Sequence, residues 1–317
     1  GIGLTLLWAF YALLHYPGGR WGDELSRKTV LVAGIGVLML GFALLTVATT
    51  YPLFLIALSV AGIGTGLYFV PMRAHISSLF VVRRGQAFGV NGALGHAGSA
   101  LGAVVAIAAV SVTTWQGAFL PVIIGLGLVA VFIHRWSRER YVVSRVEFGL
   151  RDAVTRVFTS VRVARLVVAY SLYAFTNQAI IGFLPTFLRT ERGFSPALAG
   201  TTFASLFVIG IVVGPLSGSL GDRLHHFTVA AGSLGVALAG LVGLLLTPNT
   251  ALVVGGVIVF ATGMRAFSPV MQAYVMGIFP EANVGGDFGA FKTIYILVGS
   301  LGPSYVGFVA ERATYAL

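Results

Sequence analysis

Long apolar runs separated by short polar segments dominate the chain. Ten runs carry few or no charged residues: 1–16, 30–49, 53–71, 87–111, 117–133, 166–188, 197–220, 228–246, 251–270 and 288–309. Each run has close to the roughly 20 residues that an α-helix needs to cross a bilayer. Because backbone amides in lipid must find partners within their own segment, the runs predict helices. We therefore expect an all-α polytopic membrane protein.

The charges between the runs predict an orientation. Ten spans make the loops alternate sides, and the loops at 17–29, 72–86, 134–165, 221–227 and 271–287 hold 15 Lys and Arg, against three in the opposite loops. Because cytoplasmic loops carry an excess of basic residues, the first set is predicted to be cytoplasmic. The protein is then a multi-pass protein of the cell membrane, with 134–165 as its central cytoplasmic loop.

That central loop contains a second pattern, typical of an amphipathic helix. Apolar residues recur at helical spacing and basic residues surround them; the apolar set is Leu150, Val154, Phe158 and Val161, and the basic set is Arg151, Arg156, Arg162 and Arg165. Such a helix would lie on the anionic inner leaflet of the bilayer. A plain basic tether is the alternative.

Composition changes this picture little, but it excludes several classes of function. The chain is 57% hydrophobic and 9% charged, with a formal net charge of +10. In a soluble protein that charge would suggest nucleic acid, but here the basic residues mark topology, so no nucleic-acid partner is expected. The 317 residues contain no cysteine, which excludes disulfides, thiolate chemistry and cysteine metal sites. No phosphate-binding loop is present, and neither a metal nor a cofactor is expected.

The two halves of the chain repeat each other. Gly19-x-x-x-Asp23 recurs as Gly218-x-x-x-Asp222, and "GQAFG" at 85–89 recurs as "GGDFG" at 285–289, at offsets of 199 and 200 residues. The repeating unit is six helices, and parallel repeats of this kind are typical of transporters with a site at the repeat interface. Comparing the copies indicates helices 2 to 11 of a twelve-helix protein; a ten-helix protein is the alternative. The predicted domains are a bundle at 1–133, a linker at 134–165 and a second bundle at 166–317.

The repeated turn resembles the loop signature of the major facilitator superfamily. The first copy has Gly19, Asp23, Glu24, Ser26, Arg27 and Lys28, and the second, "GSLGDR", has Gly218, Asp222 and Arg223. Glu24 and Ser26 depart from the family's usual Arg and Gly. The stretch "GFLPTFLRTERGFSPALAG" at 182–200 also looks like the outer end of the family's helix 7. The resemblance covers the whole chain and implies a secondary transporter that works by alternating access.

The resemblance also implies that both turns belong to a cytoplasmic gate. In the family the carboxylate of the first turn faces the start of helix 11, near Gly285 and Gly286 here, and holds the cytoplasmic side closed. Arg73, Arg27 and Lys28 are candidate partners of Asp23. The alternative is that these charges only fix topology. Asp287 lies at the same helix start, where it can cap that helix itself and repel Asp23.

Arg265 is the residue most indicative of a substrate site. None of the ten runs contains Asp or Glu, and Arg265 lies near the middle of the apolar stretch 251–279. An arginine inside a membrane costs at least ~2.5–3.5 kcal/mol, so its side chain should face a cavity or a partner. We expect it to bind an anionic substrate group. A partner acid on a preceding helix, or backbone carbonyls, are the alternatives.

Further cavity candidates follow from the helices that line the cavity in the family, which are helices 1, 4, 7 and 10. Tyr173 and Asn177 share one face of the seventh helix, Gln178 is adjacent, and Tyr68 lies in the fourth. Lys292 is a candidate second cation, although near a helix end it can instead extend to the cytoplasm.

The predicted function is secondary transport of a small solute, with an organic or inorganic anion as the candidate substrate class. The expected partners are that solute, the bilayer and a coupling ion, with the proton as candidate, and we expect a monomer. A proton-coupled drug efflux antiporter is the alternative, but the family patterns for it are incomplete because Leu58 and Ala103 replace its Arg and Pro. A membrane enzyme and a transporter-like sensor are further alternatives.

Overall fold

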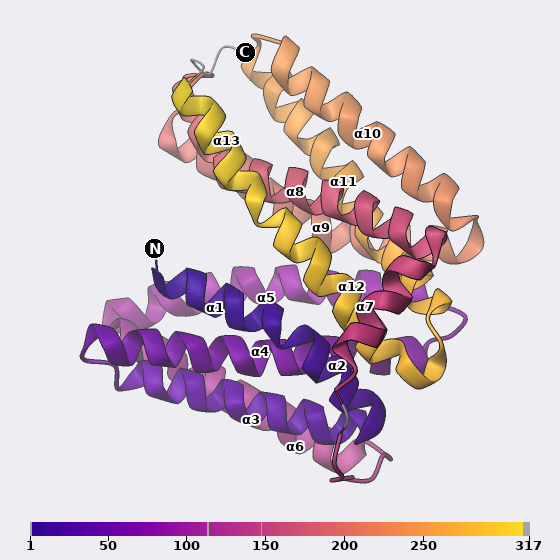
Figure 1. Cartoon of the computed structure of the whole chain (residues 1–317). Helices are drawn as coiled ribbons and strands as arrows, with labels where there is room; N and C mark the ends of the chain where they lie inside the picture. Colours follow the sequence, from indigo (N-terminus) through magenta and orange to yellow (C-terminus); the bar gives the residue numbers. More distant parts are fainter. Residues whose placement is uncertain (1, 113, 147, 313–317) are drawn as a thin grey trace. The chain divides into compact units, whose positions relative to one another are not determined.

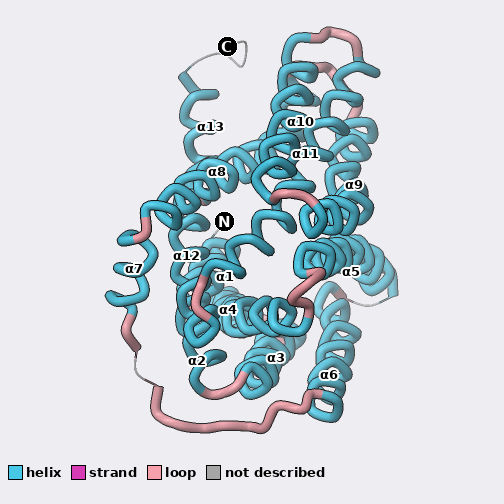
Figure 2. The backbone as a smooth tube through the Cα atoms, turned by 90° about the vertical axis from the view of Figure 1, so that its right-hand side faces the viewer, coloured by secondary structure: helices cyan, strands magenta, loops and turns pink. Residues whose placement is uncertain are grey.

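The computed structural model describes residues 2–112, 114–146 and 148–312, and this part of the chain contains helices and no strand (Figures 1 and 2). The elements are α1 (Ile2–Leu13), α2 (His15–Glu24), α3 (Arg27–Thr46), α4 (Tyr51–Leu79), α5 (Arg84–Val112), η1 (Trp115–Ala118), α6 (Phe119–Trp136), α7 (Leu150–Thr159), α8 (Val161–Thr190), α9 (Pro196–Arg223), α10 (His226–Leu246), α11 (Thr250–Ile278), η2 (Glu281–Asn283), α12 (Val284–Gly299) and α13 (Leu301–Arg312). The all-α prediction is confirmed.

In the described part of the chain, seven stretches of helix are long and apolar enough to cross a membrane: α3, α4, η1 with α6, α8, α9, α10 and α11. The predicted run 87–111 lies within α5. The runs 1–16 and 288–309 are each divided between two helices, at Leu14 and at Ser300. The exposed surface supports a lipid environment, because α6 buries none of its residues while Ile124, Leu128 and Phe132 are all more than half exposed.

The helices form two compact units, and each unit takes one segment from the opposite half of the sequence. Unit 1 comprises 1–75, 100–167 and 279–294, and unit 2 comprises 76–99, 168–278 and 295–317. The first part of α12 therefore belongs to unit 1, and the first part of α5 belongs to unit 2.

Small residues let the helices of unit 1 approach closely. A Cβ atom at Gly41 would lie 2.6 Å from the backbone nitrogen of Ala61, and one at Gly62 would lie 2.5 Å from the carbonyl oxygen of Leu7. Figure 1 shows α3 and α6 running side by side. Contacts between small residues of this kind are how helices pack in lipid, where the hydrophobic effect does not drive their association.

Unit 2 is organised around α9, α10 and α11 (Figure 1). Its core includes Leu206, Val257 and Phe260, which are at most 4% exposed. A Cβ at Gly256 would lie 2.7 Å from the backbone nitrogen of Leu244, so α11 and α10 also approach each other closely at a glycine. The unit therefore holds α11, the helix that carries Arg265, in a fixed position.

The charged turn at 17–29 is not a loop, contrary to the prediction. Residues 15 to 24 form α2, and only Leu25 and Ser26 separate it from α3. Ser26 ends the turn by capping α3, since its Oγ accepts a hydrogen bond of 3.1 Å from the amide of Thr29. Helix formation satisfies the backbone groups of this segment internally, and a charged sequence at a helix end does not prevent it.

The amphipathic pattern at 150–161 does form a helix, but its boundary and its buried face differ from the prediction. Helix α7 ends at Thr159, so Val161 and Arg162 begin α8 instead. The buried residues of α7 are Ala153 and Val157, both 0% exposed, while Phe158 is half exposed. The small side chains at 153 and 157 let α7 pack closely, which spacing of large residues alone does not reveal.

Candidate gate and substrate-binding sites

Asp23 binds the first turn of α12 within unit 1. Its Oδ1 accepts a hydrogen bond of 3.0 Å from the amide of Gly285, and its Oδ2 accepts one of 2.8 Å from Gly286. These amides belong to the first turn of a helix and have no acceptor within it, so a carboxylate is a favourable partner for them. Gly19 makes the approach possible, since a Cβ there would overlap the carbonyl of Gly285.

Asp222 makes the same contact in unit 2. Its two carboxylate oxygens accept hydrogen bonds of 2.7 and 2.8 Å from the amides of Gly85 and Gln86, at the start of α5. A Cβ at Gly218 would overlap the carbonyl of Gly85, as at Gly19 in the first copy. The internal repeat therefore places two aspartates on two helix starts in matching geometry.

The environment of Asp23 shifts its protonation. Burial raises the pKa of this carboxyl to about 6, because desolvation outweighs the opposing effect of the two amides and of Arg27 and Arg20. The carboxylate is thus held by backbone donors in a place that disfavours its charge.

Asp287 lies beside these amides. Helix α7 binds its carboxylate, so Asp287 neither caps α12 nor faces Asp23 without a partner. It is 1% exposed, and Arg156 of α7 donates hydrogen bonds of 2.7 Å from Nη2 and 3.1 Å from Nε to its Oδ1. The hydrogen bond to Asp287 raises the pKa of Arg156. A second support comes from Arg20, whose Nη1 donates a 2.8 Å hydrogen bond to Asn283, just before α12. Neither contact was predicted, because nothing in the sequence pairs the linker with this helix start.

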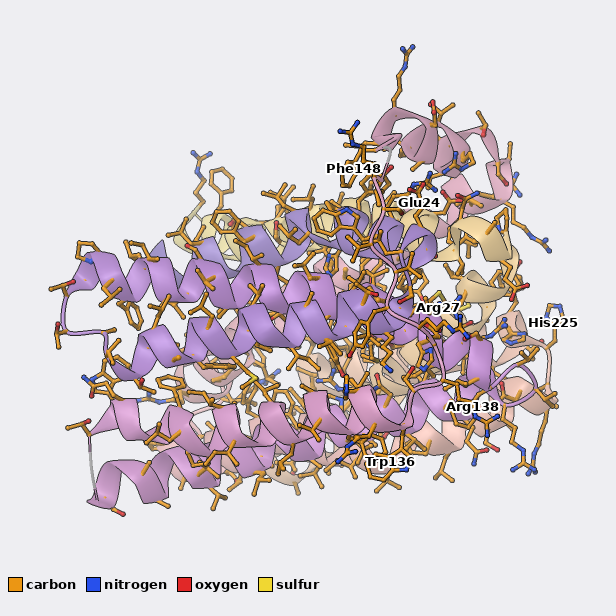
Figure 3. The ribbon with its side chains drawn as sticks, turned by 90° about the horizontal axis from the view of Figure 1, so that it is seen from below. Glu24, Arg27, Trp136, Arg138, Phe148 and His225 are labelled. Atoms are coloured by element: carbon orange, nitrogen blue, oxygen red, sulfur yellow. The ribbon has the colours of Figure 1, made fainter. Side chains whose placement is uncertain are left out.

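The basic residues of the two turns have different surroundings. The ammonium of Lys28 donates to the carbonyl oxygens of His134 and Ser137, at 2.9 and 3.1 Å, which ties α3 to the end of α6 and not to Asp23. Glu24 pairs with Arg20, one turn earlier in α2. Arg223 is exposed and makes no hydrogen bond or ion pair with the described residues. Figure 3 shows Glu24, Arg27 and Arg138, all of unit 1, at the same end of its helices.

Arg265 lies in unit 2, partly exposed, and has no carboxylate within 4 Å among the residues that the structure describes. Its Nε donates a hydrogen bond of 3.1 Å to the carbonyl of Leu206. Its guanidinium lies 5.5 Å from the ring centroid of Phe207, and the ring centroids of Phe207 and His96 are 5.9 Å apart. One donor therefore fixes the guanidinium, while both terminal nitrogens stay available for a ligand.

The other cavity candidates divide between the two units. Tyr173 lies near Arg265: its hydroxyl donates 2.9 Å to the carbonyl of Met264, and its ring stacks on Phe267 with centroids 4.6 Å apart. Asn177 makes one long contact, 3.5 Å to the adjacent Gln178, which is exposed. Tyr68 belongs to unit 1. Within unit 2, geometry thus joins Tyr173 to Arg265.

Lys292 also belongs to unit 1, and its side chain is buried. It is 4% exposed in the middle of α12, with its ammonium against the ring of Phe69. A cavity of about 590 Å³ in the same unit is lined by mainly apolar residues such as Phe42 and Leu58 and by no charged one. Among the described residues no cluster of His, Cys, Asp and Glu could hold a metal ion.

Comparison with known proteins agrees with this architecture. The family model described as Major Facilitator Superfamily matches residues 1–303. The probable sulfoacetate transporter SauU of Cupriavidus necator is 26% identical over 338 residues, covering 95% of this chain and 76% of the relative. The fosmidomycin resistance protein of Escherichia coli is 26% identical over 325 residues, covering 96% and 76%. The crystal structure of the fucose:proton symporter FucP of E. coli superposes with a TM-score of 0.82 at 16% identity, covering 100% of this chain and 85% of that one.

The family match, the helical fold and the similarity to transporters lead to one conclusion. The chain belongs to the major facilitator superfamily, and it is a multi-pass integral membrane protein that transports a small solute by secondary transport and is not an enzyme.

Proposed function

We propose that the transported solute is a small organic anion and that Arg265 binds its anionic group. The observation that carries the proposal is the state of this guanidinium: it lies in a membrane helix, one nitrogen is fixed by a backbone carbonyl, and no described carboxylate pairs with it. A charge in that position is costly unless it has a partner, and an anionic substrate supplies one. The likeness to a probable sulfoacetate transporter supports this substrate class.

The surroundings of Arg265 suit an organic anion. A planar guanidinium binds a carboxylate or sulfonate through two parallel hydrogen bonds, which both terminal nitrogens can supply. Phe207 and Tyr173 offer apolar surface beside that charge for the carbon part of the ligand. We include Asn177 and Gln178 as polar contacts at the margin of this site.

We further propose that the two aspartate contacts act in the cytoplasmic gate. Each holds a helix start through two amides, and each can release it when the carboxylate is solvated. The excess of basic residues in one set of loops supports a cell-membrane protein with its central loop in the cytoplasm. The protein would work as a monomer.

Counterflow in proteoliposomes tests the substrate class and the role of Arg265. Vesicles loaded with unlabelled sulfoacetate should accumulate labelled sulfoacetate through the unaltered protein. Arg265→Gln should reduce kcat/KM about ten- to a hundredfold, because it removes a charge-assisted contact worth about 1.5–3 kcal/mol. Arg265→Lys should keep part of the activity, since it keeps the charge but loses the planar fork.

The exposed Arg189 on α8 provides the matched control, and Arg189→Gln should leave transport within about twofold. Unchanged anion counterflow in both Arg265 variants would remove Arg265 from the site. Repeating the assay with an imposed pH gradient shows whether the proton is the coupling ion. If a neutral or cationic drug exchanges and no anion does, the efflux alternative replaces this proposal.

A further inference from the structure

A second group of cations lies in unit 1, far from Arg265 in sequence. It comprises Lys292 on α12, His15 on α2 and Arg73 on α4, arranged around the rings of Tyr11 and Phe69. Three different helices thus bring cationic or proton-binding side chains to one place. None of these five residues is acidic.

Lys292 and His15 are buried, and their side chains make few hydrogen bonds with the described residues. Lys292 is 4% exposed, and its ammonium makes a single hydrogen bond with the described residues, 3.2 Å to the hydroxyl of Tyr11. The same nitrogen lies 3.0 Å from the ring centroid of Phe69. His15 is 0% exposed, and neither Nδ1 nor Nε2 has a partner in the described part of the chain. Buried polar groups are almost always paired, so this place requires an explanation.

The cluster is rigidly built. The ring of His15 packs edge-on against Tyr11, with centroids 4.3 Å apart, and lies 5.7 Å from Phe69. One residue after Lys292, the hydroxyl of Thr293 donates 3.1 Å to the carbonyl of Ala12 and fixes the crossing of α12 over α1. The donors are therefore held in position before any ligand arrives, which reduces the ordering that binding requires.

Lys292 and His15 have no acidic partner among the described residues. No described carboxylate lies within 4 Å of Lys292 or His15, and Arg73 adds a further cation 4.2 Å from the ring centroid of Phe69. A buried ammonium is strongly disfavoured unless an opposite charge and further hydrogen bonds compensate it. An oxyanion supplies both at once, because its oxygens accept hydrogen bonds from the ammonium and from the imidazole.

We propose that Lys292 and His15 form a second anion-binding centre, which takes a carboxylate or sulfonate group of the transported solute. Tyr11 positions the ammonium, and Phe69 covers it on one side. This centre rests on the proposed anion transport, but its own ligands are distinct from Arg265. It gives unit 1 a substrate contact of its own.

Selective labelling tests the centre directly, because the 317 residues contain two lysines, Lys28 and Lys292. Protein with ¹³Cε-labelled lysine in nanodiscs gives a resonance for each, and Lys28→Met assigns them. Adding sulfoacetate should shift the Lys292 resonance saturably and leave that of Lys28 unchanged. Chloride at equal ionic strength should not shift it. No shift at saturating sulfoacetate, or an equal shift with chloride, overturns the proposal.

Transport measurements provide the second arm. Lys292→Met should raise the KM for sulfoacetate about ten- to a hundredfold, as expected for loss of a charge-assisted contact. His15→Phe keeps the ring contacts and should raise it about three- to tenfold. Arg151→Met, at an exposed position of the same unit, is the control and should stay within about twofold. An unchanged KM in both Lys292→Met and His15→Phe overturns the proposal.

The two anion proposals fail in different ways. In an Arg265→Gln background the Lys292 resonance should still respond to sulfoacetate, because the two centres have separate ligands. If Arg265→Gln abolishes transport while no anion shifts the Lys292 resonance, the second centre is wrong and the proposed function stands. If the protein neither binds nor transports any anion, both are wrong.

Discussion

At the scale of single residues, the role of a charged side chain depends on which partners surround it. Asp23 and Arg265 are both partly buried, but backbone amides bind the first, whereas two nitrogens of the second have no hydrogen-bond partner among the described residues. The carboxylate is therefore part of a contact within the protein, while the guanidinium is available to a ligand. The same distinction separates Lys28, which is bound by two carbonyls, from the buried Lys292.

The raised pKa of Asp23 gives its contact with α12 a definite pH dependence. Buried against α12 the carboxyl titrates at about 6, whereas an exposed one titrates near 3.8. The closed contact therefore binds the proton more tightly, so its stability relative to the open state is greatest below about pH 4 and is lost as pH rises through about 6. Acidification from pH 7 to pH 5 should strengthen the contact.

Hydrogen exchange of the amides in 284–291 measures this effect. Their protection factors, corrected for the intrinsic exchange rate, should rise as pH falls from 7 to 5. Asp23→Asn removes the titrating group and should abolish the pH dependence. Protection that falls on acidification of the unaltered protein would contradict the assigned sign.

At the scale of elements, α7 connects the loop that follows α6 to the start of α12. Ala153 and Val157 bury one face of this helix, and Arg156 holds Asp287 at the start of α12. The linker thus contacts a helix that lies more than a hundred residues later in the chain. Figure 2 shows α7 between the long loop that follows α6 and the start of α8.

Removing Arg156 should leave a carboxylate buried without a counter-ion. Arg156→Gln should lower the free energy of unfolding by about 1–3 kcal/mol, because the cost is the desolvated charge of Asp287 and not only the lost contact. Arg151→Gln, an exposed change on the same helix, should have little effect. Thermal unfolding in nanodiscs measures both. Adding Asp287→Asn to Arg156→Gln should restore part of the loss, and a further loss would contradict this explanation.

Element prediction from the sequence succeeded where one physical signal dominated. Apolar length predicted ten spans, and seven helices of the described residues are long and apolar enough to cross a membrane, since the bilayer imposes that length; helical spacing predicted α7. The pattern did not reveal the buried face of α7, because small residues such as Ala153 carry almost no hydrophobic signal. It also could not reveal the cluster at Lys292, because Lys292 is 281 residues from Tyr11 and only the packing of α12 against α1 brings the two together.

At the scale of the whole molecule, the internal repeat gives two related contacts, at Asp23 and at Asp222. More additional interactions hold the helix start at the first than at the second. Residue 87 is Ala where the second copy has Asp287, so the contact at Asp222 has no equivalent of the Arg156 ion pair. The start of α12 is also held through Arg20 and Asn283. Several contacts thus hold the start of α12 besides that of Asp23, whereas the start of α5 depends more strongly on the contact of Asp222.

This inequality predicts different responses to the same change. Asp222→Ala, which removes the acceptor oxygens, should reduce the protection of amides in 84–90 more than Asp23→Ala reduces that in 284–291, since α12 keeps its other supports. Hydrogen exchange at neutral pH measures both. Adding Arg156→Gln to Asp23→Ala should bring the two responses closer together. Equal losses in the two single variants would show that the extra contacts do not support α12.

The exchange of segments between the units has a consequence for synthesis. Asp23 and its partner Gly285 are 262 residues apart in the chain, and unit 1 is incomplete without 279–294. A ribosome that adds about 5–20 residues per second therefore needs roughly ten to fifty seconds between them. Throughout that interval the nascent first half must wait in the membrane with the binding surface for α12 uncovered. The protein's first unit is thus among the last parts to be finished.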